Sequence, residues 1–180
     1  MMEPSNTEKS KLDIKIRYAE EKDIERIHKI YAYYVLNDVA TFEEEVPSTE
    51  EMNQRRLDIQ VKNKLPYYVA TITIDNDDFV VGYSYVSYYR TRSAYRFTLE
   101  DSIYLDYQYL GYGIGSLLLQ QLIIKTRELG FKQMIAVIGG FNEASIKLHE
   151  KYQFSNLSVL KSVGFKFNKW IDVYVLQLSL

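Results

Sequence analysis

The chain has 180 residues, 47% of them hydrophobic and 26% charged, which is typical of one globular domain large enough to bury a core. Its formal net charge of -2 provides no basic field of the kind that binds nucleic acid. Cysteine is absent and only two histidines occur, so disulfides, thiolate nucleophiles, zinc–cysteine sites and histidine-rich metal sites are excluded.

The N-terminal segment MMEPSNTEKSK is polar and lacks the apolar stretch of a secretory signal. No apolar run approaches the about 18–20 residues that a membrane-spanning helix needs. We therefore expect a soluble cytoplasmic protein without a membrane partner, with a flexible tail over residues 1–11 and a single domain over residues 12–180.

Periodicity in the first third of the chain predicts one strand and two helices. Residues 13–18 (DIKIRY) alternate between polar and apolar side chains, as a strand does. The helix expected next has one apolar face, formed by Ile24, Ile27, Tyr31 and Val35. Ser48 and Glu51 have the spacing of a capping box, which predicts that a second helix begins there and covers residues 48–62.

The rest of the chain alternates between strand and helix signals. The predicted elements are strands at 67–74, 79–89 and 95–105, a helix at 116–129, a strand at 133–138, a helix at 143–152, and strands near 163–167 and 172–178. Turn-forming residues 75–78 separate the first two strands, and Gly130 is expected to end the longer helix. This order indicates an α/β (α+β) domain built on a mixed sheet, without internal repeats.

Tyrosine is unusually frequent in this sequence, with 17 copies. Five of them cluster at Tyr83, Tyr85, Tyr88, Tyr89 and Tyr95. We attribute the cluster to strand propensity and packing.

The segment YLGYGIGSLLLQ, residues 109–120, places three of the eight glycines at the start of the predicted helix. The first amides of a helix have no partner within the helix and carry partial positive charge. Glycine lets the oxygens of an anion approach such amides without meeting a Cβ atom. A phosphate-bearing ligand is therefore the expected occupant, and a flexible turn without a ligand is the alternative.

Two nucleotide-binding motifs do not fit this segment. A Walker loop needs lysine after its last glycine, whereas Gly115 is followed by Ser116. The dinucleotide fingerprint spaces its glycines as G-x-G-x-x-G and belongs to the first βαβ unit of a chain, and neither condition holds here.

The segment YLGYGIGSLLL instead resembles the acyl-CoA pyrophosphate loop of the GNAT superfamily of N-acetyltransferases, whose pattern is Gln/Arg-x-x-Gly-x-Gly/Ala. Within that superfamily the chain is most similar to the phosphinothricin N-acetyltransferase type. Three further stretches carry the resemblance: FTLEDSIYL (97–105), IAVIGGFNEASIKLHE (135–150) and VGFKFNKWIDV (163–173). It runs from about residue 14 to the C-terminus.

The resemblance implies a GNAT-like acyl-CoA N-acyltransferase fold, in which helices flank a central, mostly antiparallel sheet. It implies direct acetyl transfer from acetyl-CoA, without a metal, to the α-amine of a small amino-acid-like substrate of the phosphinothricin or methionine sulfoximine type. A homodimer is expected on the same ground. Alternatives are a protein N-terminal or lysine acetyltransferase, a CoA-binding module without catalysis, and, less favoured, a nicotinamide oxidoreductase.

The resemblance also assigns the residues that bind the cofactor. On the strand, they are Ile103 and Leu105, whose backbone is expected to pair with the pantetheine amides, and Tyr104 between them. The others are the loop residues Gly111, Tyr112, Gly113, Ile114, Gly115 and Ser116, and Asn142. Asn142 is also a good helix N-cap, and the two roles are compatible. Leu110 stands where the family has Gln or Arg, and Gln153 replaces a glycine, so we expect weakened affinity for CoA and a different end of the last helix.

Acetyl transfer to an amine needs a base, because amines are mostly protonated near neutral pH. Glu100 is a lone carboxylate after the apolar or neutral run Phe97-Thr98-Leu99, and burial would raise its pKa. The resemblance places the base of the family on this residue. Glu100 shares a strand face with Thr98 and Ser102, whereas Asp101 points to the opposite face.

His149 stands where many members of the superfamily have a tyrosine that protonates the departing thiolate. The tripeptide Leu148-His149-Glu150 matches the phosphinothricin type, and an imidazole can act as acid or relay. A structural histidine is the alternative.

The acceptor is expected to meet Phe42, Arg90, Arg92 and Tyr95. Two guanidinium groups can hold a carboxylate or phosphinate by paired hydrogen bonds, and the family has basic residues and a tyrosine at these places. The aromatic Phe42 matches a residue over the acceptor pocket. A solvated basic turn is the alternative for TRSAYR.

Overall fold

One seven-stranded sheet organises the chain in the computed structural model, which describes residues 12–180. The predicted tail, residues 1–11, lies outside the described residues. The spatial order of the strands is β1-β2-β3-β4-β5-β7-β6, and neighbours are antiparallel except for β4 and β5, which run parallel. The mixed, mostly antiparallel sheet is therefore confirmed.

The elements follow one another in the predicted order. The strands are β1 (Lys15–Tyr18), β2 (Tyr67–Ile74), β3 (Asp77–Tyr88), β4 (Thr98–Leu105), β5 (Gln133–Gly139), β6 (Ser155–Lys166) and β7 (Lys169–Ser179). The α-helices are α1 (Ile24–Asn37), α2 (Thr49–Leu57), α3 (Ile114–Glu128) and α4 (Glu143–Lys151). A π-helical segment, Asp58–Lys62, continues α2, and short 3-10 helices cover Glu21–Asp23, Ser93–Tyr95 and Tyr107–Tyr109.

Local chemistry fixes the helix ends. Ser48 Oγ accepts a hydrogen bond from the Glu51 amide at 3.1 Å, as the capping pattern predicts. Asn142 Oδ1 accepts one from the Ser145 amide at 2.9 Å and begins α4 in the same way. Gly130 follows α3 with a φ of +84°, the left-handed conformation that commonly ends a helix.

Several predicted boundaries were wrong. The strand predicted at 95–105 begins at Thr98, after the 3-10 helix Ser93–Tyr95, and the last strand begins at Lys169 rather than 172. The strand predicted near 163–167 begins at Ser155, and its register with β7 shifts twice, between Ser155 and Ser158 and between Leu160 and Gly164. These irregularities break the alternation by which a strand is recognised in a sequence. The helix α3 begins at Ile114 rather than 116, directly after the left-handed Gly113.

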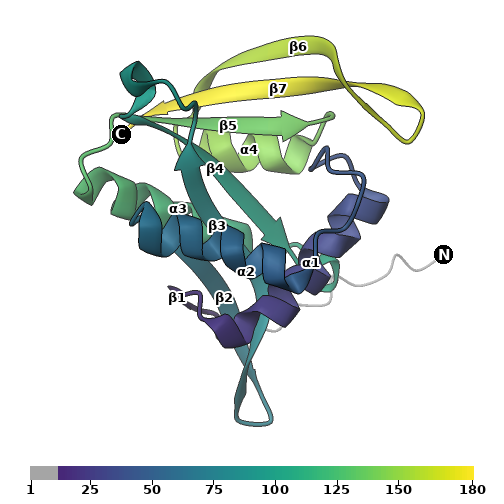
Figure 1. Ribbon diagram of the computed structural model, residues 1–180, viewed down its shortest axis with the longest axis vertical. Helices are drawn as coiled ribbons and strands as arrows, with labels where there is room; N and C mark the ends of the chain where they lie inside the picture. The colour runs from purple at the N-terminus through teal and green to yellow at the C-terminus, as the bar shows by residue number, and fades with distance from the viewer. Residues whose placement is uncertain (1–11) are drawn as a thin grey trace, which may run out of the picture.

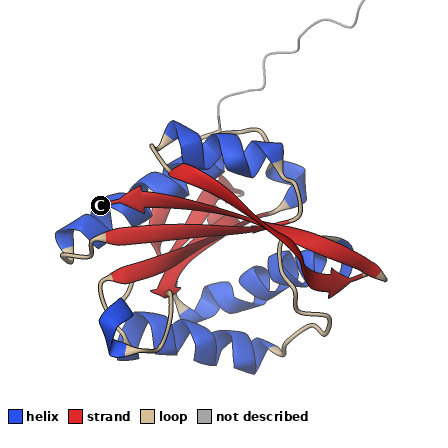
Figure 2. Cartoon of the chain, turned by 90° about the horizontal axis from the view of Figure 1, so that it is seen from above, coloured by secondary structure: helices blue, strands red, loops and turns tan. Residues whose placement is uncertain are grey.

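Helices cover both faces of the sheet (Figures 1 and 2). α3 and α4 lie over one face, where Leu99 of β4 and Leu118 of α3 are fully buried in one apolar cluster. α1 and α2 lie over the other, where Ile27 of α1 and Tyr83 of β3 belong to a second cluster. Each such buried apolar side chain stabilises the fold by about 1.5–3 kcal/mol. Within the described range no helix is long and apolar enough to cross a membrane.

The sheet opens between β4 and β5. The two strands pair from Thr98 with Gln133 to Asp101 with Ala136, where the pairing stops. β4 continues to Leu105 and β5 to Gly139, each held only by its outer neighbour. A strand edge is thus left open in the middle of the sheet.

Candidate active site

A cavity of about 780 Å³ lies where β4 and β5 part. Of the predicted site residues, it brings together Phe42, Glu100, Ile103, Tyr104, Leu105, Gly111, Gly113, Ile114, Gly115, Ser116, Asn142 and His149. Tyr112 is half-buried instead against the apolar cluster that contains Leu99 and Leu118. Arg90, Arg92 and Tyr95 do not line this cavity. Among residues 12–180 no cluster of three or more acidic or histidine side chains could hold a metal ion.

The glycines before α3 have different roles. Gly111 and Gly113 have φ values of +81° and +80°, which side-chain-bearing residues rarely adopt. A Cβ atom at Gly113 would meet nothing within 4 Å, so this residue borders open space at the start of α3. A Cβ at Gly115 would lie 3.3 Å from Leu148 Cδ2, which makes this glycine a packing residue between α3 and α4. The open space and the first amides of α3 fit an anionic group.

The backbone of β4 points alternately to β3 and to the open edge. The Asp106 amide donates to the Val81 carbonyl at 2.9 Å, toward β3. By alternation, the polar groups of Ile103 and Leu105 point away from β3 toward the cavity, whereas those of Tyr104 point toward β3. Tyr104 therefore contributes its side chain rather than its backbone to the cavity.

One of these groups already has a partner that the sequence did not reveal. The Leu105 carbonyl accepts a hydrogen bond from Tyr34 Oη at 2.7 Å. Burial raises the pKa of Tyr34 to about 12, so the phenol keeps its proton and remains a donor. Within residues 12–180, no side chain bonds to the backbone groups that Ile103 points toward the cavity.

Glu100 combines partial burial with the absence of a fixed partner. Its carboxylate forms no hydrogen bond or ion pair with any residue in the range 12–180. Burial and the charge of Asp101 raise its pKa above the ordinary value, while Arg90 opposes this shift. An unpaired carboxylate of raised pKa is suited to accept a proton.

His149 is nearly fully buried and held at both ring nitrogens. Nδ1 lies 2.7 Å from the Ser145 carbonyl oxygen, so Nδ1 must be the donor of that hydrogen bond. Nε2 lies 3.1 Å from Asp101 Oδ2. Two lone pairs cannot face each other favourably, so a second proton lies between Nε2 and the carboxylate. Burial lowers the pKa of His149, but the charge and hydrogen bond of Asp101 outweigh it and raise the pKa above 6.5.

Asp101 is therefore a site residue that the sequence analysis missed. It lies on the strand face opposite Glu100, as expected, and that face is the one that α4 covers. Its second oxygen, Oδ1, is buried and has no hydrogen-bond partner within residues 12–180. Only the three-dimensional position of α4 reveals the pair, because 48 positions separate the two residues.

A buried lysine holds the segment after α1, residues 38–41, which forms one wall of the cavity. Lys166 of β6 is 1% exposed, and its Nζ donates to the carbonyls of Asp38 at 2.6 Å and Thr41 at 2.8 Å. Burial lowers the pKa of this ammonium group. Phe42 follows in the same loop and packs tightly: a Cβ at Gly164 would lie 2.2 Å from its ring.

The predicted anion-binding residues lie apart from the cavity. Arg90 and Arg92 are exposed in the segment after β3, and Tyr95 is 38% exposed. Arg90 stacks over the ring of Tyr89 at 5.0 Å, and its charge still reaches Glu100. The structure thus places this segment beside the candidate base without forming a closed clamp.

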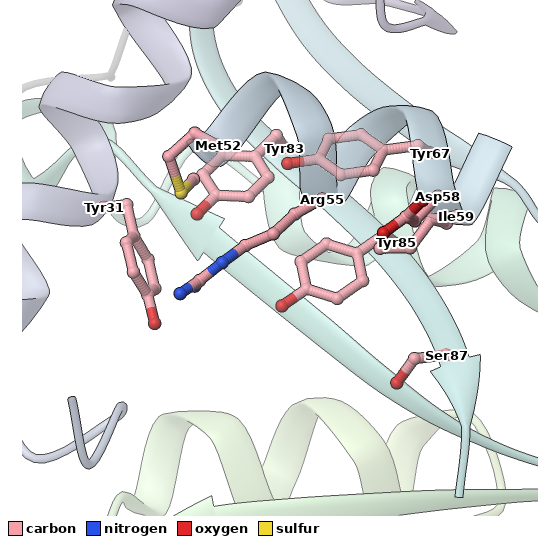
Figure 3. Close-up of a pocket in the computed structure, with 9 residues that line it drawn as sticks. All are labelled: Tyr31, Met52, Arg55, Asp58, Ile59, Tyr67, Tyr83, Tyr85 and Ser87. Carbon is pink, nitrogen blue, oxygen red and sulfur yellow. The ribbon is translucent and has the colours of Figure 1, made fainter. Parts of the chain in front are cut away.

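A second cavity, of about 310 Å³, lies next to the first (Figure 3). Its wall consists of Tyr31, Met52, Arg55, Asp58, Ile59, Tyr67, Tyr83, Tyr85 and Ser87. Tyr31 and Tyr85 line both cavities. Two tyrosines of the sequence cluster, Tyr83 and Tyr85, therefore line this second cavity.

Comparison with known proteins agrees with this architecture. Residues 16–175 match the family described as Acetyltransferase (GNAT) domain. The chain is 42% identical to a phosphinothricin N-acetyltransferase of Alcaligenes faecalis, over 90% of this chain and 80% of that protein. It is 32% identical to an L-methionine sulfoximine/L-methionine sulfone acetyltransferase of Salmonella typhimurium, over 92% and 94%. A GNAT superfamily phosphinothricin acetyltransferase from Sinorhizobium meliloti, solved in complex with AcCoA, superposes with a TM-score of 0.87 at 44% identity, covering 93% of this chain and 88% of that one.

Proposed function

Because the chain belongs to the GNAT acetyltransferase family, we propose that it transfers the acetyl group of acetyl-CoA to the α-amine of a small amino acid of the phosphinothricin or methionine sulfoximine type. The observation that carries this proposal is the cavity at the parting of β4 and β5, which Glu100, the glycine loop and His149 line together. Acetyl-CoA supplies an activated thioester there.

The cavity fits an acyl-CoA at two places. The open space beside Gly113 and the first amides of α3 suit the pyrophosphate, for which we propose residues 111–116. The open edge of β4 at Ile103 suits an extended chain with amide groups, such as the pantetheine arm, and Asn142 at the start of α4 lines the same space. These assignments follow the family pattern and the geometry of the cavity.

Glu100 is the proposed base. It takes the proton of the acceptor ammonium, which leaves a neutral amine able to attack the thioester carbonyl. Its raised pKa and lack of a fixed partner support this role.

His149, charged through its contact with Asp101, is the proposed acid. The Nδ1 proton is held within α4 by the Ser145 carbonyl, so we assign the transfer to the Nε2 proton, which must leave Asp101 Oδ2 to reach the departing sulfur. After its transfer the ring is neutral and the sulfur leaves as a thiol, so the charges balance. The negative charge of Asp101 then favours reprotonation of His149 before the next turnover.

Arg90, Arg92 and Tyr95 are proposed to hold the carboxylate of the acceptor, and Phe42 to cover it. The charge of Arg90 lowers the pKa of Glu100, so Arg90 lies near the carboxylate that must contact the acceptor amine. This proximity supports the proposal. Exposed guanidinium groups can reorient toward a bound carboxylate, because their rotamers exchange rapidly.

We propose that the active protein is a cytoplasmic homodimer. The edge strand β6 exposes several apolar side chains, namely Leu157, Val159, Leu160 and Val163. Apolar residues gathered on an edge strand favour association. Light scattering coupled to size-exclusion chromatography measures the assembly directly, and a monomer would contradict this part of the proposal.

The proposed function is tested by incubating the protein with acetyl-CoA and a panel of acceptors, with thiol release as readout and mass spectrometry of the product. The panel contains L-methionine sulfone, L-methionine sulfoximine, L-phosphinothricin, the common amino acids, and a lysine-containing peptide. We expect acetylation of free amino acids at the α-amine. Thiol release with the peptide alone, or none above the acceptor-free control, would overturn the proposal.

A further inference from the structure

The second cavity continues the face of the sheet on which the candidate base lies. Ser87 of β3, which lines this cavity, is the direct cross-strand neighbour of Glu100. Tyr85, which lines both cavities, faces Ser102 in the same way. Directly opposed residues on antiparallel strands have Cβ atoms about 4.5–5.5 Å apart. A molecule with its amine at Glu100 can therefore extend along this face into the second cavity.

The wall of the second cavity holds a hydrogen-bond donor without a partner. Tyr83 is fully buried, and its Oη has no hydrogen-bond partner within the described chain. Burial raises its pKa well above 10, so the hydroxyl keeps its proton. Figure 3 shows this oxygen pointing toward the space between Tyr31 and Arg55. A buried polar group left unsatisfied costs about 1–3 kcal/mol, which an accepting atom of a ligand would offset.

The only cation in this wall is already matched by carboxylates. Arg55 donates to Glu43 at 2.6 Å and to Glu51 at 2.5 Å, and Asp58 adds a third carboxylate to the surroundings. The excess of negative charge opposes entry of an anion. Phenol rings and the thioether of Met52 make up most of the remaining wall, so an uncharged group is the favoured occupant.

The backbone of this wall is also unusual. Asp58 and Ile59 belong to the π-helical segment that continues α2. Such segments are rare and occur frequently at functional sites. The volume of about 310 Å³ corresponds to about ten water molecules at about 30 Å³ each, ample for one amino-acid side chain.

We propose that this tyrosine-lined cavity holds the side chain of the acceptor, and that it selects an uncharged side chain with a hydrogen-bond-accepting oxygen over one that ends in an anion. This inference rests on the proposed function and narrows its substrate class to neutral polar α-amino acids, such as those with a sulfone or a carboxamide. Tyr83 donates the hydrogen bond that recognises the oxygen.

The test compares kcat/KM for two pairs of acceptors, L-glutamine with L-glutamate and L-methionine sulfone with L-phosphinothricin. We expect the neutral member of each pair to be favoured at least about ten-fold. Tyr83→Phe removes an unpaired hydroxyl and keeps the ring, so the fold is retained. This variant should lower kcat/KM for L-methionine sulfone about ten-fold. It should leave kcat/KM for L-norleucine and the KM for acetyl-CoA unchanged. Tyr68→Phe, on the opposite face of β2, is the matched control and should change none of these values.

Direct binding separates this inference from the proposed function. Calorimetric titration of L-methionine sulfone into the CoA-saturated protein should show binding that Tyr83→Phe weakens about ten-fold. If this result is obtained without acetylation of any acceptor, the cavity assignment stands and the proposed function fails. Preference for the anionic members, or equal binding by wild type and Tyr83→Phe, would overturn the cavity assignment even if acetylation is observed.

Discussion

Lys151 Nζ donates a hydrogen bond to Ser116 Oγ at 2.9 Å, which brings an ammonium group from the end of α4 to the first turn of α3. The family has a Gln or Arg at the position of Leu110, and this chain lacks that polar group. Lys151 supplies a positive charge from another element at the same loop.

Replacement of Lys151 by Met should therefore raise the KM for acetyl-CoA. The group is exposed and screened by solvent, so we expect a loss of about 1 kcal/mol, or about five-fold. Leu110→Arg in the same variant should restore the affinity. Lys147→Met, one turn earlier on α4, is the control, and an equal effect of both lysine variants would exclude a specific role.

Gly113 and Gly130 allow a matched test of the glycine loop. They flank α3, have φ values of +80° and +84°, and in both cases an added Cβ would meet nothing within 4 Å. Alanine at either position should cost about 1–2 kcal/mol of unfolding free energy through left-handed strain. Only Gly113→Ala should also weaken acetyl-CoA binding, by more than about ten-fold in a calorimetric titration, where about 1.4 kcal/mol corresponds to ten-fold. Equal affinities in the two variants would remove the loop from the cofactor site.

Glu100→Gln should lower kcat by about 10²–10⁴-fold, because the amide cannot accept the ammonium proton. Affinity for acetyl-CoA should stay unchanged, and the rate should partly recover at high pH as free amine becomes available. In the wild type, burial and the charge of Asp101 raise the pKa of Glu100, so the rate rises with pH through that raised value. Glu45→Gln, exposed in the loop before α2, is the control. A wild-type pH–rate profile in Glu100→Gln would show that another group is the base.

Asp101→Asn should alter the pH dependence of both stability and rate. Asp101 raises the pKa of His149 above 6.5, so charged His149 stabilises the fold fully below about pH 6.5, and this contribution is lost as pH rises through the raised value. In Asp101→Asn both raising effects of Asp101 are lost. Burial, the largest cause, then lowers the pKa of His149 against the Ser145 hydrogen bond alone, so urea unfolding should no longer show a loss of stability as pH rises through the raised value. We also expect kcat to fall at lower pH than in the wild type.

His28 provides the control for the histidine. It lies outside both cavities, with Nε2 2.8 Å from the Pro47 carbonyl oxygen. His149→Gln removes the proposed acid and should lower kcat at every pH, whereas His28→Gln should keep the wild-type profile. A rate in Asp101→Asn that follows the wild type at every pH would show that the pair is structural only.

Arg90→Ala and Arg92→Ala should each raise the KM for the acceptor and leave that for acetyl-CoA unchanged. Loss of one charge-assisted hydrogen bond to the acceptor should raise this KM about ten-fold. Arg90→Ala should also move the ascending, acid-side limb of the rate profile to higher pH, because Arg90 lowers the pKa of Glu100, the proposed base. Arg96→Ala, whose guanidinium stacks 4.6 Å from the centre of the Phe97 ring, is the control. Equal activity toward amino acids and their amides would contradict a carboxylate contact.

The sequence predicted those parts of the fold that depend on local chemistry. The alternation around Glu100, the caps at Ser48 and Asn142, and the turn at Gly130 each act within a few residues, and the structure has them as expected. The register shifts of β6 depend instead on its partner β7, so no local pattern reveals where that strand begins.

The candidate site shows the same division. Glu100 and the glycines could be found because their neighbours in sequence are also their neighbours in the strand and the loop. Asp101 and His149, and Lys166 and the carbonyls of Asp38 and Thr41, meet only through packing of distant elements. The tyrosines of β3 could be assigned to packing from the sequence, but the hollow between them depends on how α2 lies over the sheet.

In the proposed binding mode, the parting of β4 and β5 makes the bound cofactor part of the folding equilibrium. In a continuous sheet, the polar groups that Ile103 turns toward the gap would pair with the backbone of the neighbouring strand β5. An acyl-CoA that pairs with them binds the folded chain and not the unfolded one, so it shifts that equilibrium by mass action. At a concentration one hundred times its Kd, such a ligand adds about 2.7 kcal/mol to the stability of the protein. The chain would therefore resist heat and proteolysis best where its own co-substrate is abundant, and its lifetime would follow the supply of activated acetyl groups.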